Sequence, residues 1–132
     1  MKRAVLDASA LMTYFVGRPG APKVKELLAD AADGKKALLM SVVNWGEVYY
    51  SIWRTKGEGF AQQALAIIAQ LPIEIVDADA ELTKLAAEFR AEHKLPYADC
   101  FATALASLRK ATLATSDADF EVVEKQIDIL NV

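Results

Sequence analysis

The sequence predicts an α/β fold, with a mainly parallel sheet of about five short strands flanked by helices on both faces. Short apolar runs, typical of strands buried on both faces, alternate along the chain with longer segments of helical spacing. The 132 residues contain no internal repeat, low-complexity tract or linker. Residues 1–132 are therefore expected to form a single domain.

The first half of the chain contains two predicted strands, each a short apolar run that ends at a polar residue. Residues 4–6 form the first and end at Asp7, and residues 37–40 form the second and end at Ser41. Apolar residues recur at helical spacing between and after these strands. The predicted helices cover 8–16, 22–34, a segment from Ser41 or Asn44 to Gly57, and 60–71.

The second half continues the alternation of strands and helices. Asp79 is placed to cap a helix that continues as far as His93. A further helix is expected after Pro96, over residues 97–110, and a short helical turn over 120–125. The predicted strands are 73–76, 112–115 and 127–130.

Composition and charge exclude several classes of protein and site. The chain is 54% hydrophobic and 25% charged, which indicates a globular protein. A net charge of −3 argues against a broad basic face, so a role on nucleic acid requires local geometry or metal ions. The lone cysteine and lone histidine exclude an internal disulfide and a zinc site built from several thiolates or imidazoles.

The N-terminus and the apolar runs bear on localisation. Asp7 interrupts the N-terminal segment too early for a signal peptide. The longest apolar runs are shorter than the roughly 20 residues that a membrane span needs. A soluble cytoplasmic protein is expected.

Four acidic residues are predicted to converge at one edge of the sheet. Asp7 ends the first strand and Asp117 follows the fourth, while Glu47 and Asp99 lie in the first turns of helices that follow strands. Functional sites of open parallel sheets form at the carboxyl ends of the strands. Four carboxylates there would repel one another unless cations lie between them, and Mg²⁺ and Mn²⁺ prefer such oxygen ligands.

Each acid also has a purely structural interpretation. Asp7 suits a turn or a helix cap, and Glu47 suits a capping box with Asn44. Asp99 would interact favourably with a helix dipole, and Asp117 and Asp119 are common turn residues. The joint placement of the four acids favours the metal site.

Other candidates for chemistry are weaker. Cys100 lies in an apolar helix with no histidine placed to activate it, so a packed core residue is expected. His93 is expected to be a solvated residue at a helix end. The aromatic residues of the third helix extend too far around it for complete burial, which indicates a subunit or partner interface. They are Trp45, Tyr49, Tyr50 and Trp53.

The chain resembles PIN-domain proteins of the VapC toxin type over nearly its whole length. The resemblance rests on four motifs in order, whose residues are Val5 to Leu11, Val43 to Tyr50, Tyr97 to Ala102 and Leu113 to Phe120. By this resemblance, Asp7, Glu47, Asp99 and Asp117 form an acidic metal site, with Asp119 as a fifth member. Ser9 and Thr115 match polar positions that line the site.

The resemblance implies a Mg²⁺- or Mn²⁺-dependent endoribonuclease that acts as the toxin of a toxin–antitoxin pair. Such proteins form homodimers and are inhibited by an antitoxin whose C-terminal segment covers the acidic groove. We expect Asp7, Asp99 and Asp117 to hold the principal metal and Glu47 to serve a second metal or the attacking water. Water would attack in line, without a covalent enzyme intermediate, and leave 5′-phosphate products.

Three alternatives remain open. A magnesium-binding receiver-like signalling domain would carry paired acids after the first strand, where this chain has Ala8 and Ser9 after Asp7. A haloacid-type phosphatase would need a second aspartate at the position of Ser9. A PIN fold that serves as a binding scaffold would lack metal-dependent cleavage altogether. The RNA target cannot be deduced from the sequence.

Overall fold

The sheet has five strands, all parallel, in the order β3-β2-β1-β4-β5. The computed structural model describes residues 2–132. The strands are β1 (Lys2–Leu6), β2 (Lys36–Ser41), β3 (Ile73–Val76), β4 (Thr112–Thr115) and β5 (Ile129–Asn131). The predicted parallel α/β sheet is thus confirmed, and the last strand begins two residues later than expected.

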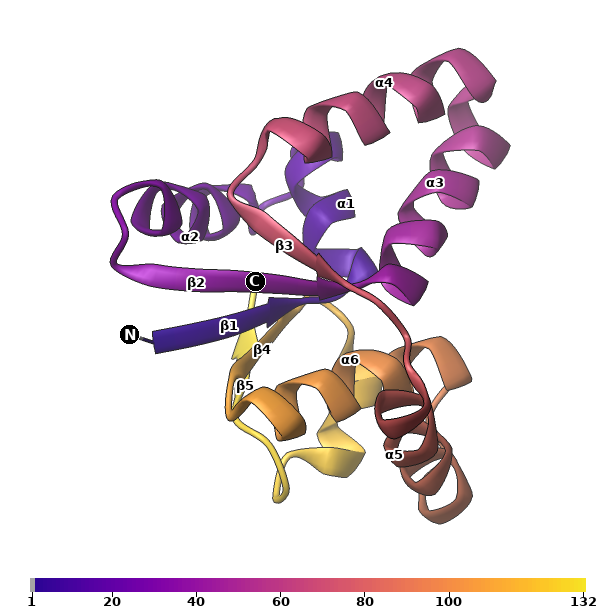
Figure 1. Ribbon diagram of the computed structural model, residues 1–132. Coiled ribbons are helices and arrows are strands. Elements are labelled where there is room, and N and C mark those ends of the chain that lie inside the picture. Colours follow the sequence, from indigo (N-terminus) through magenta and orange to yellow (C-terminus); the bar gives the residue numbers. More distant parts are fainter. Residues whose placement is uncertain (1) are drawn as a thin grey trace.

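Helices cover both faces of the sheet (Figure 1). One face carries α1 (Ala8–Val16), α2 (Ala21–Ala32), α3 (Val42–Lys56) and α4 (Glu58–Gln70). The other carries α5 (Ala80–Glu92), α6 (Tyr97–Arg109) and the 3₁₀ helix η1 (Ala118–Val123). Helices α3 and α4 pack against each other and project away from the sheet as a hairpin. Within residues 2–132, no helix combines the length and apolar character needed to cross a membrane.

Alternate residues of the central strands enter two separate cores. In β1, Ala4 and Leu6 pack among α1 to α4, whereas Val5 packs among α5, α6 and η1. Burying both faces explains why these strands are continuous apolar runs. At about 25 cal/mol per Å² of apolar surface, such burial is the main source of stability.

Capping residues fix the helix starts that position the acids. Asp7 caps α1 by accepting a hydrogen bond from the Ala10 amide at 2.9 Å. Ser41 caps α3 through the Val43 amide at 3.2 Å, so the helix begins before Asn44 and the Asn44 capping box is wrong. Asp79 caps α5, as predicted.

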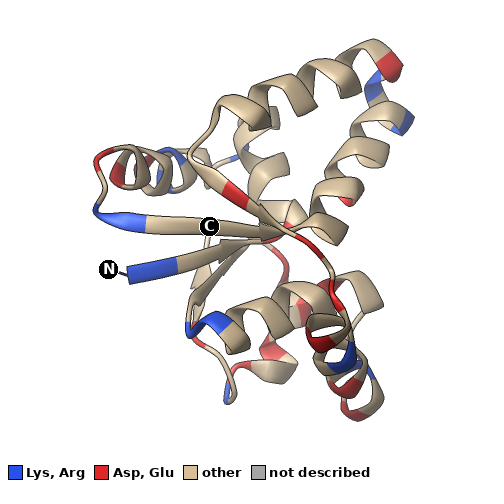
Figure 2. Cartoon of the chain, viewed as in Figure 1, with Lys and Arg blue, Asp and Glu red and all other residues tan. Residues whose placement is uncertain are grey.

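The chain reverses its winding direction between β1 and β4. From β1 the chain passes to β2 and β3 on one side, and β4 and β5 lie on the other side. The carboxyl ends of β1 and β4 therefore flank a topological switch point, where ligands of such sheets bind. Lysine or arginine occupies the first positions of β1 and β2, whereas acidic residues gather at the opposite ends of the strands (Figure 2).

Gly20 allows the end of β5 to pack beside the start of α2. A Cβ atom on Gly20 would overlap the carbonyl carbon of Val132, whose amide donates to Thr115 O at 2.9 Å. Gly20→Ala is therefore expected to displace the end of β5 and to lower the free energy of unfolding by about 1–3 kcal/mol. Urea-induced unfolding measures this change.

Gly59→Ala is the matched control, because a Cβ atom on Gly59 in α4 meets open space. Alanine is the better helix former, so the control should leave the free energy of unfolding unchanged or raise it by up to about 1 kcal/mol. Equal unfolding midpoints for Gly20→Ala and the wild type would contradict the packing described for β5.

Candidate metal and active site

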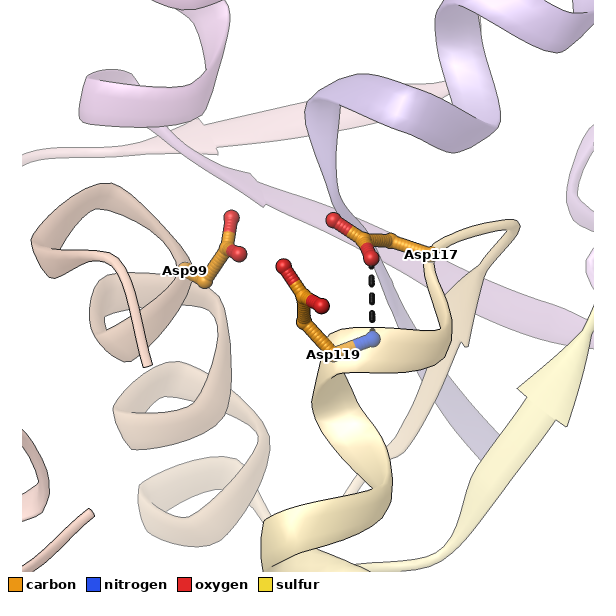
Figure 3. Close-up of side chains that lie close together, drawn as sticks. All are labelled: Asp99, Asp117 and Asp119. Carbon is orange, nitrogen blue, oxygen red and sulfur yellow. Dashed lines mark hydrogen bonds between the residues drawn. The ribbon is translucent and has the colours of Figure 1, made fainter. Parts of the chain in front are cut away.

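Three aspartates from two helices bring carboxylate oxygens together at the switch point. Asp99 lies in the first turn of α6, and Asp117 and Asp119 lie at the start of η1. One oxygen from each lies within 4.8 Å of the others. Asp117 Oδ1 also accepts a hydrogen bond from the Asp119 amide at 2.9 Å, which holds the two residues at a fixed separation (Figure 3).

Asp7 lies beside this group and is held by protein donors on both oxygens. Its Oδ2 accepts from the Thr115 hydroxyl at 2.6 Å, and its Oδ1 accepts from the Ala10 amide at 2.9 Å. The Ser9 hydroxyl lies 2.8 Å and 3.0 Å from the two oxygens. Asp7 is 3% exposed, so its position is set by the fold.

Thr115 links Asp7 to the three-aspartate group. Its hydroxyl oxygen accepts a hydrogen bond from the Asp117 amide at 3.0 Å while it donates to Asp7. The main chain adds a second link, because the Asp7 amide donates to Ala114 O at 3.3 Å. The ends of β1 and β4 are thereby fixed relative to each other.

Glu47 reaches the site from the first turns of α3. The side-chain amide of Asn44 donates to Glu47 Oε1 at 2.7 Å, and Glu47 is half-buried. Both are on one face of α3, since residues three apart on a helix are neighbours. Glu47 also raises the pKa of Asp99 through charge repulsion, so the two carboxylates act on each other.

The acids perturb one another because they are buried together. Desolvation, followed by repulsion from Asp117, Glu47, Asp7 and Asp119, raises the pKa of Asp99 to about 7. Desolvation also raises the pKa of Asp7 to about 6, against opposing hydrogen bonds from Thr115, Ala10 and Ser9. The pKa of Glu47 is raised by the same burial.

These side chains fit a divalent cation. The donors are all carboxylate oxygens, which Mg²⁺ and Mn²⁺ prefer. None of the ion pairs within residues 2–132 involves a site acid, so the negative charge is not neutralised by lysine or arginine. The pKa values of Asp99 and Asp7 are raised mainly by desolvation, and repulsion between the carboxylates raises them further.

The structure places all five acids at the predicted edge, in two sets. The closest group is Asp99, Asp117 and Asp119, whereas Asp7 and Glu47 lie beside it and are held by hydrogen bonds. Asp119, the member that also suits a turn, thus contributes an oxygen to the closest group. Asp7 and Asp117 serve as helix caps as well.

Cys100 and His93 are the two other residues with side chains suited to catalysis. Cys100 is a fully buried core residue, as expected, and desolvation raises the pKa of its thiol to about 11. The prediction that His93 is solvated is wrong. His93 is half-buried at the end of α5, with its ring 6.1 Å from that of Phe89 in a stacked arrangement.

Asn44 belongs to the site although the sequence predicts for it only the role of N-cap of the third helix. It lies inside α3, fully buried, and holds Glu47. Its spacing of three residues from Glu47 was a usable signal, because that spacing places both side chains on one face.

The raised pKa values of Asp99 and Asp7 predict how the stability of the cation-free protein depends on pH. An aspartate has an ordinary pKa of 3.8, whereas folding raises that of Asp99 to about 7 and that of Asp7 to about 6. The folded state therefore binds more protons than the unfolded state between these values. Stability from these groups is fully present below pH 3.8 and is lost as the pH rises through 6 and 7.

Adding Mn²⁺ should raise the melting temperature more at pH 8 than at pH 5. At pH 8 the carboxylates are ionised and repel one another, so the cation both finds its ligands free and removes the repulsion. Thermal unfolding at both pH values measures the difference, with NaCl at matched ionic strength as control. An equal Mn²⁺ effect at the two pH values would contradict the site.

Comparisons with known proteins bear on the family and the fold of this chain. The PIN domain family model matches residues 4–126. A search of curated proteins gives no match. Among solved structures, the chain is similar to the VapBC2 complex of Rickettsia felis bound to a promoter DNA fragment, with a TM-score of 0.78, 20% identity and 98% coverage of each chain.

Two further structures show the same fold. VapC20 of Mycobacterium tuberculosis, a sarcin–ricin loop cleaving toxin, has a TM-score of 0.74 and 21% identity, covering 91% of this chain and 94% of that one. A toxin–antitoxin complex from Klebsiella pneumoniae has a TM-score of 0.70 and 22% identity, covering 96% and 95%. Because the family model spans most of the sequence and the fold agrees, the chain belongs to the PIN domain family.

Proposed function

We propose that this protein is a Mg²⁺- or Mn²⁺-dependent endoribonuclease and the toxin of a toxin–antitoxin pair. The observation that carries the proposal is the group of three carboxylate oxygens within 4.8 Å, flanked by Asp7 and Glu47 and without an ion-pair partner in the described part of the chain. Toxin chains with this fold support it, among them one that cleaves the sarcin–ricin loop.

Asp99, Asp117 and Asp119 would hold the principal cation, with Asp7 beside them directly or through water. A divalent cation supplies a lowered pKa for the attacking water and stabilises the charge that develops on the phosphate. Thr115 and Ser9 keep the Asp7 carboxylate in one orientation by donating to its oxygens. Asp119, the fifth member of the site expected from the resemblance, is here proposed as a ligand of the principal cation together with Asp99 and Asp117.

Glu47 would contact the cation, directly or through the attacking water, and orient that water. One of its oxygens is engaged by Asn44, which leaves Oε2 to accept a proton or a hydrogen bond from water. A covalent intermediate is disfavoured, because the thiol of Cys100 is buried and its pKa is raised to about 11. Water would attack the phosphorus in line with the P–O3′ bond, which breaks. The departing 3′-oxygen takes up a proton, so the products would carry 5′-phosphate and 3′-hydroxyl ends.

The proposed protein partner is an antitoxin segment that lies along α1, α3 and α4. A cavity of about 290 Å³ between these helices is lined mainly by apolar side chains, including Met12, Phe15, Phe60 and Ile67. Phe60 and Ile67 are 59% and 45% exposed, an unusual placement for large apolar residues. Both α1 and α3 begin at the acidic edge, so a segment in this cavity could continue across the site.

A homodimer is also proposed.

Incubation of the purified protein with total cellular RNA tests the activity. We expect discrete fragments in Mg²⁺ or Mn²⁺ and no cleavage in EDTA, with 5′-phosphate ends found by fragment-end sequencing. Fragments with 2′,3′-cyclic phosphate ends that also form in EDTA would refute the proposed chemistry. Co-expression with the product of a small adjacent reading frame tests the toxin–antitoxin assignment, and the expected result is restored growth.

A further inference from the structure

Asn44 connects two helices that each carry an acid of the site. Its side-chain nitrogen donates to Glu47 Oε1 at 2.7 Å on its own helix α3. The same nitrogen donates to the main-chain oxygen of Ala98 in α6 at 3.1 Å. Ala98 directly precedes Asp99, so one amide group fixes both the Glu47 carboxylate and the start of the helix that carries Asp99.

A primary amide is the side chain that these two contacts require. They need two N–H donors on one short, uncharged group, and asparagine provides them. Serine or threonine has one donor. Aspartate would place a second negative charge against Glu47 and leave the Ala98 carbonyl without a donor.

Asn44 lowers the stability of the folded protein compared with an apolar residue at the same position. The side chain is fully buried, and its Oδ1 has no hydrogen-bond partner among residues 2–132. A buried unsatisfied oxygen costs about 1–3 kcal/mol, and asparagine is a weak helix former. An apolar residue of similar shape would therefore suit the position better if stability were its sole purpose, whereas local rules are typically broken at functional sites.

We propose that Asn44 is a positioning residue that holds Glu47 in one orientation, with Oε2 directed to the cation and water of the site. This inference rests on the proposed nuclease function. Asn44 acts through Glu47 and does not itself contact RNA or cation. By fixing one oxygen it makes Glu47 offer a single oxygen, and by fixing Ala98 it sets the separation of Glu47 from Asp99.

The test is Asn44→Leu, which keeps the branching at Cγ and removes both donors and the unpaired oxygen. We expect kcat for RNA cleavage to fall about 10- to 100-fold, the usual effect of losing a partner that orients a metal-site ligand. The KM for RNA should change little. The larger leucine side chain can lower the melting temperature, and this fall should not exceed that of the control variant. Val48→Ala is the matched control. Val48 is fully buried one turn further along α3, so this change lowers stability without removing a hydrogen bond to Glu47.

A double-mutant cycle shows whether Asn44 acts through Glu47. In a Glu47→Gln background, Asn44→Leu should lower kcat by no more than about twofold, because groups that act as a unit are not additive. Wild-type kcat in Asn44→Leu would overturn the inference. A full additional loss in the Glu47→Gln background would overturn it as well.

A binding measurement separates this inference from the proposed function. Calorimetry should show Mn²⁺ binding weakened about tenfold by Asn44→Leu and unaffected by the same change in Glu47→Gln. If the wild type cleaves no RNA, the nuclease proposal fails, and this Mn²⁺ cycle still decides the role of Asn44. Unchanged Mn²⁺ affinity in both backgrounds, without an effect on kcat, would refute it.

Discussion

Asp99→Asn should lower kcat for RNA cleavage by more than about 100-fold, since losing a group that merely orients a metal ligand already costs 10- to 100-fold. Asparagine keeps the shape and one oxygen but removes the charge that binds a cation. Asp99 is also the acid whose pKa, raised to about 7 mainly by desolvation, is raised further by repulsion from all four of the other carboxylates. Single-turnover cleavage of a defined RNA measures the loss.

The same substitution should raise the stability of the metal-free protein near pH 8. There the Asp99 carboxylate is ionised, half-buried and repelled by its neighbours, so removing its charge relieves that repulsion. Mn²⁺ should then raise the melting temperature less than in the wild type. Asp33→Asn, a change at an exposed position beyond α2, is the control and should alter neither property. Loss of cleavage together with a large loss of stability would instead indicate misfolding.

Asp117→Asn is expected to have an effect of similar size, more than about 100-fold on kcat. Asp117 belongs to the closest oxygen group and raises the pKa values of Asp7, Glu47 and Asp99 by repulsion. Asparagine can still accept the hydrogen bond from the Asp119 amide, so η1 should keep its start. The loss would then report the missing charge and not a displaced helix.

Asp119→Asn serves as the comparison for Asp117→Asn. Asp119 is exposed, so its charge is better screened by water and its contribution should be smaller, about tenfold. Parallel measurements of kcat and Mn²⁺ affinity rank the two residues. A larger loss in Asp119→Asn than in Asp117→Asn would contradict the smaller contribution expected of the exposed Asp119.

The sequence was sufficient for the fold because the strands are buried on both faces. Continuous apolar runs such as 37–40 cannot be amphipathic helices, and their alternation with helical segments leaves a parallel sheet as the solution. The expected bounds of β3 and β4 agree with the structure. The start of β5 was misplaced because Ile127 is buried before the strand begins, and apolar pattern does not distinguish such a residue from a strand residue.

The sequence predicts the edge of the sheet at which the acids meet, but it does not predict the distances between their oxygens. Strand ends and helix starts placed the acids on one side, since topology fixes which ends meet. Which oxygens lie closest depends on the turn after β4, where Asp117 holds the Asp119 amide. The role of Asn44 depends on contact with Ala98, 54 residues away, and no local pattern contains that contact.

A Mg²⁺ titration of the metal-stripped protein tests the central claim most directly. Initial rates of RNA cleavage and melting temperatures would be measured over the same range of Mg²⁺ concentration. Cleavage should be absent without the cation and should rise to saturation over the range in which the cation stabilises the wild type, with neither response in Asp99→Asn. Cleavage that is unchanged in EDTA and persists in Asp99→Asn would contradict the account.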